Sequence, residues 1–126
     1  MLKLTLPYGC LASDNLRKGL AKEAWRKYKT AREAATMIAM SQIQGSRPRY
    51  KEPVTVELLF WLPDERRRDP SNLLKGCLDA LTGLAYDDDS RIRSLSWLVM
   101  GLDRDNPRVE ITVMPGVYRP TWPEDV

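Results

Sequence analysis

Histidine is absent from the 126-residue sequence, which excludes a histidine general base, a Ser-His-Asp triad and any histidine-ligated metal. The two cysteines, Cys10 and Cys77, show no CxxC spacing, so neither a zinc site nor a disulfide framework is indicated. No apolar run approaches the ~20 residues of a membrane-spanning helix, and residues 1–7 are too short and too alternating for a secretory leader. We therefore expect a cytoplasmic protein with reduced thiols and no membrane partner, whose chemistry uses carboxylates, lysine, tyrosine or hydroxyl groups.

Charge is distributed unevenly along the chain. Residues 1–16 are neutral, residues 17–51 carry ten basic and two acidic side chains, and residues 52–126 carry nine basic and fourteen acidic ones. A basic segment joined to an acidic one is typical of a polyanion-binding surface beside a site for metal cations. A solvated helix face followed by an acidic surface would explain the same pattern.

The chain has the length and the 43% hydrophobic content of one globular domain. Spacing of apolar residues and turn signals predicts strands at 2–7, 53–62, 95–102 and 108–114, with helices at 17–43 and 70–84. Residues 103–107 fit a hairpin loop between the last two strands. The order β-α-β-α-β-β predicts an α/β (α+β) fold, a mixed sheet of about four strands packed with two main helices. We expect this domain over residues 1–114 and a flexible tail over 115–126.

Two aromatic residues lie on the apolar stripe of the first predicted helix. Trp25 and Tyr28 recur there at helical spacing among alanines. We interpret this stripe as core packing rather than as a stacking surface for bases.

The residues with the clearest chemistry surround the second predicted helix. Three arginines, Arg66, Arg67 and Arg68, precede Asp69, the helix carries Lys75 and Asp79, and an acidic turn follows at 87–89. Mg²⁺ prefers oxygen ligands and takes only one or two protein carboxylates, while arginine and lysine can hold phosphates. Water bound to such a metal could act as the nucleophile, which removes the need for histidine.

Each of these features also has a plain structural explanation. The arginines could form a solvated turn, and Asp69 could serve only as a helix cap. Lys75 and Asp79, four residues apart, could form an exposed pair worth ~0.3–0.5 kcal/mol. The acidic turn could be merely polar.

The run from Arg67 to Ile92 resembles the RusA family of Holliday junction resolvases. Members share a basic lead-in, the pattern Asp-x-Asp-Asn-x-x-Lys, a helix that often reads Asp-Ala-Leu, and an Asp-Asp pair. The matching residues are Asp69, Asn72, Lys75, Asp79-Ala80-Leu81 and Asp88-Asp89. The first strand, with Asn15 soon after it, resembles the opening of the family.

The resemblance implies a dimeric endonuclease that uses Mg²⁺, with Mn²⁺ as a substitute, to cut four-way DNA junctions by paired nicks. Asp69 and Asp89 would bind metal and act in catalysis, with Asp88 as a neighbouring ligand. Lys75 would contact the phosphate or stabilise developing charge, and Ser71 and Asn72 would support the site. We expect DNA contacts, mainly to the backbone, from Arg66, Arg67, Arg68, Arg47, Arg49, Lys51, Arg17 and Lys18.

Ser71 departs from the family pattern, because it stands where the second acidic residue is expected. Three interpretations follow. In the first, Asp69, Asp89 and either Asp88 or water hold the metal. In the second, Asp79 or Asp87 replaces the missing carboxylate. In the third, cleavage is weak or lost while junction binding persists. We favour the first, because Mg²⁺ tolerates water ligands. A catalytically inactive branched-DNA-binding protein and an α/β interaction domain without a nucleic-acid role remain the alternatives.

The length of the second predicted helix keeps the acidic residues at its two ends apart. A straight helix over 70–84 is about 22 Å long, and residues 85–88 span at most about 14 Å, so Asp69 and Asp89 cannot easily meet within one chain. Either the helix starts later or breaks near Gly76, or two antiparallel helices pair about a two-fold axis. In the second case, which we favour, each site takes Asp69 from one chain and Asp89 from its partner.

Overall fold

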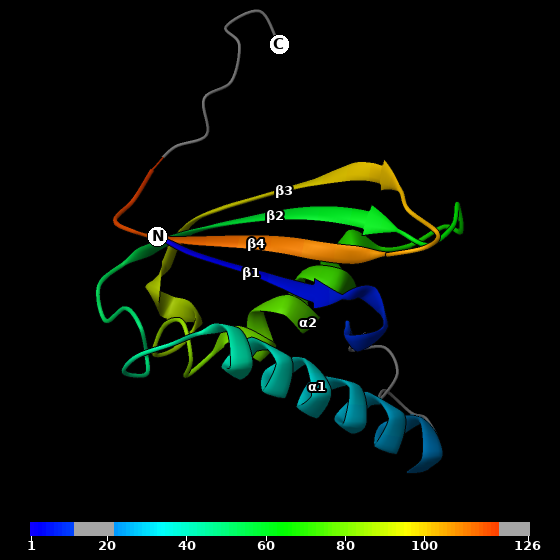
Figure 1. The fold of residues 1–126 in the computed structure, drawn as a ribbon, viewed down its shortest axis with the longest axis horizontal. Coiled ribbons are helices and arrows are strands. Elements are labelled where there is room, and N and C mark those ends of the chain that lie inside the picture. Colours follow the sequence, from blue (N-terminus) through cyan, green and yellow to red (C-terminus); the bar gives the residue numbers. More distant parts are fainter. Residues whose placement is uncertain (12–21, 119–126) are drawn as a thin grey trace, which may run out of the picture.

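The computed structural model describes residues 1–11 and 22–118, and it confirms a single domain of mixed α/β class (Figure 1). The elements are β1 (Leu2–Pro7), η1 (Tyr8–Cys10), α1 (Lys22–Gln42), β2 (Val54–Leu62), α2 (Pro70–Leu81), η3 (Asp89–Arg91), β3 (Ile92–Leu102) and β4 (Arg108–Pro115). The predicted order β-α-β-α-β-β is confirmed. The predicted DNA contacts Arg17 and Lys18, together with Asn15, lie outside the described residues.

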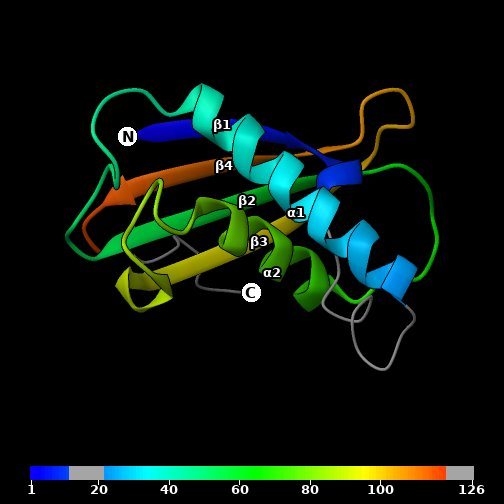
Figure 2. The same ribbon diagram turned by 90° about the horizontal axis from the view of Figure 1, so that it is seen from below.

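The four strands form one mixed sheet in the order β1-β4-β2-β3. β2 and β3 run parallel, whereas β4 is antiparallel to both β1 and β2. Both helices cover the same face of the sheet, and Figure 2 shows them side by side when that face is viewed directly. β1 and β3 are therefore the two edges, and the opposite face carries no helix among the described residues.

Alternation along the strands places the core between the sheet and the helices. The strands contribute Leu2, Leu4, Leu6, Val54, Val56, Leu58, Phe60, Val109, Ile111 and Val113, and the helix side contributes Ala35, Ala39, Ile43, Leu73, Cys77, Ala80, Leu81 and Tyr86. Burial raises the pKa of the Cys77 thiol to about 12, so this cysteine is a protonated core residue. The side chains of Trp25 and Tyr28 lie outside the described part of the structure, so their predicted packing stays a prediction.

The predicted hairpin between the last two strands is wrong. β3 and β4 are consecutive in the sequence, but β2 lies between them and pairs with both. The connection at 103–107 passes the end of β2, where the Asp103 N–H donates to the Leu62 carbonyl at 2.8 Å. The turn residues at 103–107 reverse the direction of the chain between β3 and β4. They do not make the two strands neighbours, because β2 packs between them through its apolar face.

The predicted end of the second helix is also corrected. α2 ends at Leu81, because Thr82 has extended dihedral angles (φ −63°, ψ 128°) and Gly83 has a positive φ of 83°. Glycine adopts that left-handed conformation readily, so the chain turns there instead of continuing the helix. The helix runs through Gly76 without a break.

Residues just after β4 return to the sheet. The buried Thr55 hydroxyl donates to the Gly116 carbonyl at 3.0 Å and accepts from the Tyr118 N–H at 2.9 Å. These bonds satisfy a polar side chain that is only 2% exposed. Residues 119–126 of the predicted flexible tail lie outside the described residues, so that prediction is untested. Within residues 1–11 and 22–118, no helix is both long and apolar enough to cross a membrane.

Candidate active site along helix α2

Asp69 forms the N-terminal cap of α2. Its Oδ1 accepts from the Ser71 N–H at 3.0 Å and from the Ser71 hydroxyl at 2.7 Å, and Pro70 follows as the first helical residue. Both features are typical of a helix start. Asp69 is therefore a helix cap, as the structural explanation predicted. Ser71 is a hydrogen-bond donor to Asp69 in this arrangement, which leaves the remaining carboxylate oxygen of Asp69 for another ligand.

The three arginines before Asp69 have different surroundings. The Arg68 guanidinium donates to Asp64, to the Tyr8 hydroxyl and to the carbonyls of Asp64 and Arg66, and its side chain is only 15% exposed. Arg68 thus stabilises the loop conformation. The hydrogen bond from the Arg66 N–H, followed by that from the Arg68 guanidinium, keeps the pKa of Asp64 below its usual value. Arg66 and Arg67 are exposed, so they are the more accessible cations for a phosphate.

One face of α2 carries Ser71, Lys75 and Asp79, because residues four apart lie one above another on a helix. With Asp89 and Leu95 they line a groove of about 300 Å³ between α2 and β3. Its remaining wall is apolar and is made by Leu74 and Leu78. The groove thus brings Lys75, Asp79 and Asp89 together.

Asp89 is placed by the turn that follows α2. The Thr82 hydroxyl donates to the Leu78 carbonyl at 3.0 Å and lies 3.3 Å from Asp89 Oδ1. Tyr86 is fully buried beneath this turn, and its hydroxyl donates to the same Leu78 carbonyl at 3.1 Å. Burial and the nearby Asp89 carboxylate raise the pKa of Tyr86, so its hydroxyl stays protonated as a donor. Sequence reasoning missed Thr82 and Tyr86, because neither belongs to a periodic pattern or a charged motif.

The other two acids of the turn have local partners. Asp88 caps η3 by accepting from the Ser90 N–H at 2.7 Å, and hydrogen bonds from Ser90 lower the pKa of its carboxyl group. Asp87 pairs with Arg91 at 3.1 Å. Of the three acids at 87–89, Asp89 is the one that lines the groove.

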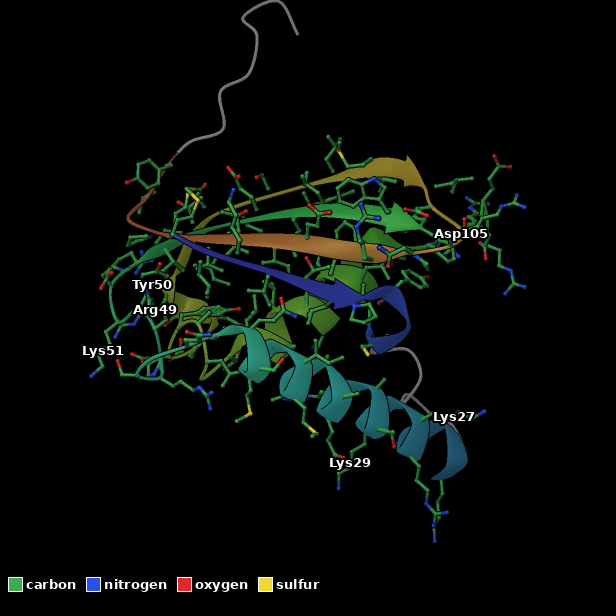
Figure 3. The ribbon with its side chains drawn as sticks, viewed as in Figure 1. Lys27, Lys29, Arg49, Tyr50, Lys51 and Asp105 are labelled. Atoms are coloured by element: carbon green, nitrogen blue, oxygen red, sulfur yellow. The ribbon has the colours of Figure 1, made fainter. Side chains whose placement is uncertain are left out.

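A basic loop lies beside the same end of α2. The Arg49 N–H donates to the Leu84 carbonyl at 2.9 Å and the Tyr50 N–H donates to the Ala85 carbonyl at 3.0 Å, which ties the loop to the turn that precedes Asp89. Figure 3 shows Arg49, Tyr50 and Lys51 together at this end of the molecule. Arg47, Arg49 and Lys51 are exposed, so their charges face solvent next to the acidic turn.

Asp69 and Asp89 of one chain do not lie at a common site. α2 has twelve residues and is about 18 Å long, from a rise of ~1.5 Å per residue, and Asp69 and Asp89 lie at its opposite ends. Across the described part of the chain, no three acidic or cysteine side chains gather closely enough to hold a metal ion. The oxygen donors suit Mg²⁺ chemically, but Asp69 and Asp89 of a single chain lie too far apart to bind the same ion. The unbroken helix also removes the alternative of a break near Gly76.

Comparison with known proteins gives a family match whose range includes α2 and its groove. A family model described as endodeoxyribonuclease RusA matches residues 13–114. That range contains α2, its groove, both acidic ends and the basic loop. Among curated proteins, none matches the chain. Because the matched range covers most of the sequence, the chain belongs to the RusA family of endodeoxyribonucleases.

Proposed function

We propose that this protein is a Mg²⁺-dependent endonuclease that resolves Holliday junctions by paired phosphodiester cleavage. It acts as a homodimer in the cytoplasm of a bacterial or phage-infected cell, and Mn²⁺ can replace Mg²⁺. Family membership supports endonuclease activity. The observation that carries the site assignment is the groove in which Lys75 lies on the same helix face as Ser71 and Asp79 and opposite Asp89.

The roles of the residues follow from their chemistry and position. Asp69, Asp89 and the neighbouring Asp88 supply hard oxygen atoms, which Mg²⁺ binds in preference to nitrogen or sulfur. Lys75 places a positive charge in the groove, where it would hold a phosphate or offset charge that develops on it. Ser71 orients Asp69 through its two hydrogen bonds, and the Asn72 N–H donates to the Asp69 carbonyl at 3.2 Å, while the Asn72 side chain would support the site.

Basic side chains at both ends of α2 suit a phosphate backbone that runs past the groove. Arg66 and Arg67 lie before Asp69, and Arg47, Arg49 and Lys51 lie beside the turn of Asp89. Arg68 already donates hydrogen bonds to Asp64 and Tyr8, so we expect it mainly to stabilise the loop conformation rather than to contact DNA. Such contacts read backbone and shape rather than base sequence.

A cleavage assay on a synthetic four-way junction tests the function. With Mg²⁺ we expect symmetric nicks in two strands of like polarity, and with linear duplex of the same sequence we expect none. A gel shift of the same junction in Ca²⁺ measures binding alone. Binding without cleavage would favour the inactive branched-DNA-binding protein that Ser71 suggests, and the absence of both would favour an α/β interaction domain.

Ser71→Asp restores the family's second carboxylate next to Asp69. We expect tighter binding of Mn²⁺, by about tenfold, because a charged oxygen replaces a neutral hydroxyl. Titration calorimetry with Mn²⁺ measures this without relying on cleavage. Ser71→Asn, which adds similar bulk without charge, is the matched control and should leave the affinity unchanged. Equal affinity for both variants would contradict a metal role for this position.

A further inference from the structure

The sheet face opposite the helices carries an apolar strip along β2 and β3. Leu58 is buried beneath the helices, so alternation places Leu59 on the opposite face, where it pairs in register with Leu98. Trp61 and Met100 follow two residues further along the two strands, and we call these four side chains the apolar strip. Leu98 is 57% and Met100 is 49% exposed, and no described helix covers them. Exposed apolar side chains grouped in this way usually mark a surface that another segment or molecule covers.

The chain that follows β4 crosses the sheet toward this strip. It turns at Gly116, which has a positive φ of 94°. The Tyr118 N–H then donates to the Thr55 hydroxyl at 2.9 Å, and the Tyr118 carbonyl accepts from the Ser94 hydroxyl at 2.6 Å. Thr55 and Ser94 pair in register on β2 and β3, so the chain passes from β4 over β2 to β3. Figure 1 shows these residues on the side of the sheet away from the helices.

The next residues of the sequence have the length to reach the strip. Trp122 comes four residues after Tyr118, and Leu98 comes four residues after Ser94, to which Tyr118 is bound. Four residues span about 13 Å in a strand, at ~3.3 Å each, and about 12 Å in an extended polyproline conformation, at ~3.1 Å each. Pro120 favours such an extended conformation, for itself and for the residue before it. An extended segment that runs parallel to β3 therefore brings Trp122 to Leu98.

Charge on the same path is complementary. Glu57 lies between Thr55 and Leu59 on β2, its side chain is exposed, and no described basic residue forms an ion pair with it. Arg119 comes directly after the bound Tyr118, so its guanidinium can reach this carboxylate. An arginine stem also covers apolar surface while its charged end stays in water. The segment thus offers a cation and an indole in the order in which the sheet offers a carboxylate and apolar side chains.

We propose that residues 119–126 lie along the apolar strip of their own chain, with Trp122 packed on Leu59 and Leu98. The segment runs parallel to β3 on the sheet face and is held by side chains, since prolines at 120 and 123 have no N–H to donate. It covers the face that the helices leave uncovered, and it leaves the α2 groove accessible. This interaction does not rest on the proposed function, and it would replace the flexible tail that the sequence predicts.

Methionine oxidation tests the contact, because the chain contains its own control. Met100 lies in the strip and Met37 lies on α1, and they are 49% and 69% exposed without residues 119–126 in place. With dilute peroxide and peptide mass spectrometry, we expect Met100 of the full chain to oxidise at least about fivefold more slowly than Met37, because a covered side chain reacts only when its cover opens. Trp122→Ala should bring Met100 to the rate of Met37, and Trp122→Phe, which keeps an aromatic ring, should retain the protection. The rate of Met37 should be the same in all three proteins.

Three results would overturn the proposal. Equal rates for Met100 and Met37 in the unaltered chain would leave the strip open for a separate partner protein. Protection of Met100 that persists in Trp122→Ala would mean that this residue does not cover the strip. Protection that disappears on dilution by about a hundredfold would assign the cover to a second copy of the chain, since a contact within one chain does not depend on concentration. Loss of junction cleavage would change none of these rates, so failure of the proposed function is distinguishable.

Discussion

Asp69→Asn should lower junction cleavage by about 100-fold or more while leaving the protein as stable as wild type. Asparagine caps a helix about as well as aspartate, so the bond to the Ser71 N–H survives. The substitution removes only the negative charge. Loss of a charge-stabilising group from an active site typically lowers the reaction rate by about 100-fold or more. Initial rates on a four-way junction in Mg²⁺, together with urea denaturation, measure the two effects separately.

Asp69→Ala is the companion variant, since it removes both the charge and the cap. It should lose cleavage to the same extent and should also lower the free energy of unfolding by about 1 kcal/mol. Junction binding in Ca²⁺ should remain for both variants. If Asp69→Asn cuts as fast as wild type, Asp69 is a structural cap and nothing more.

Junction binding should weaken by about a thousandfold between about 50 and about 200 mM salt, because a protein that contacts six or more phosphates releases that many counterions. We expect the exposed basic side chains near α2 to supply such contacts, and Figure 3 shows two of them, Arg49 and Lys51. Fluorescence anisotropy of a labelled junction in Ca²⁺ measures the affinity without cleavage. A flat salt dependence would exclude backbone recognition.

Lys51→Ala and Lys3→Ala form a matched pair for the same measurement. Lys51 lies in the basic loop beside the Asp89 turn, whereas Lys3 points to the sheet face without helices, because Leu2 and Leu4 are buried on the helix side. Losing one phosphate contact from each chain of the homodimer lowers the slope of log K against log salt by about 1.8, since each contact contributes about 0.9. We expect that change for Lys51→Ala and none for Lys3→Ala. A change for Lys3→Ala and none for Lys51→Ala would place the DNA on the sheet face without helices.

The sequence predicted the local structure around α2. Asp69 caps α2, Lys75 lies on its exposed face, and the acidic turn follows the helix. Each of these depends on neighbours within a few residues, where capping and helical spacing operate. Asp79 was only an alternative ligand, although its spacing of four from Lys75 places it in the same groove. The role of Arg68 could not be foreseen, because Tyr8 lies 60 positions away.

The sequence by itself determined the order of elements, the start of α2 after Asp69 and the family. Local periodicity, turn residues and a motif of about 26 residues are enough for these. Tertiary structure alone decided that β2, not β4, lies beside β3, that Asp69 and Asp89 stay at opposite ends of an unbroken helix, and that β3 is an open edge. These features depend on which apolar faces pack against one another across the whole chain, and no short stretch of sequence contains that information.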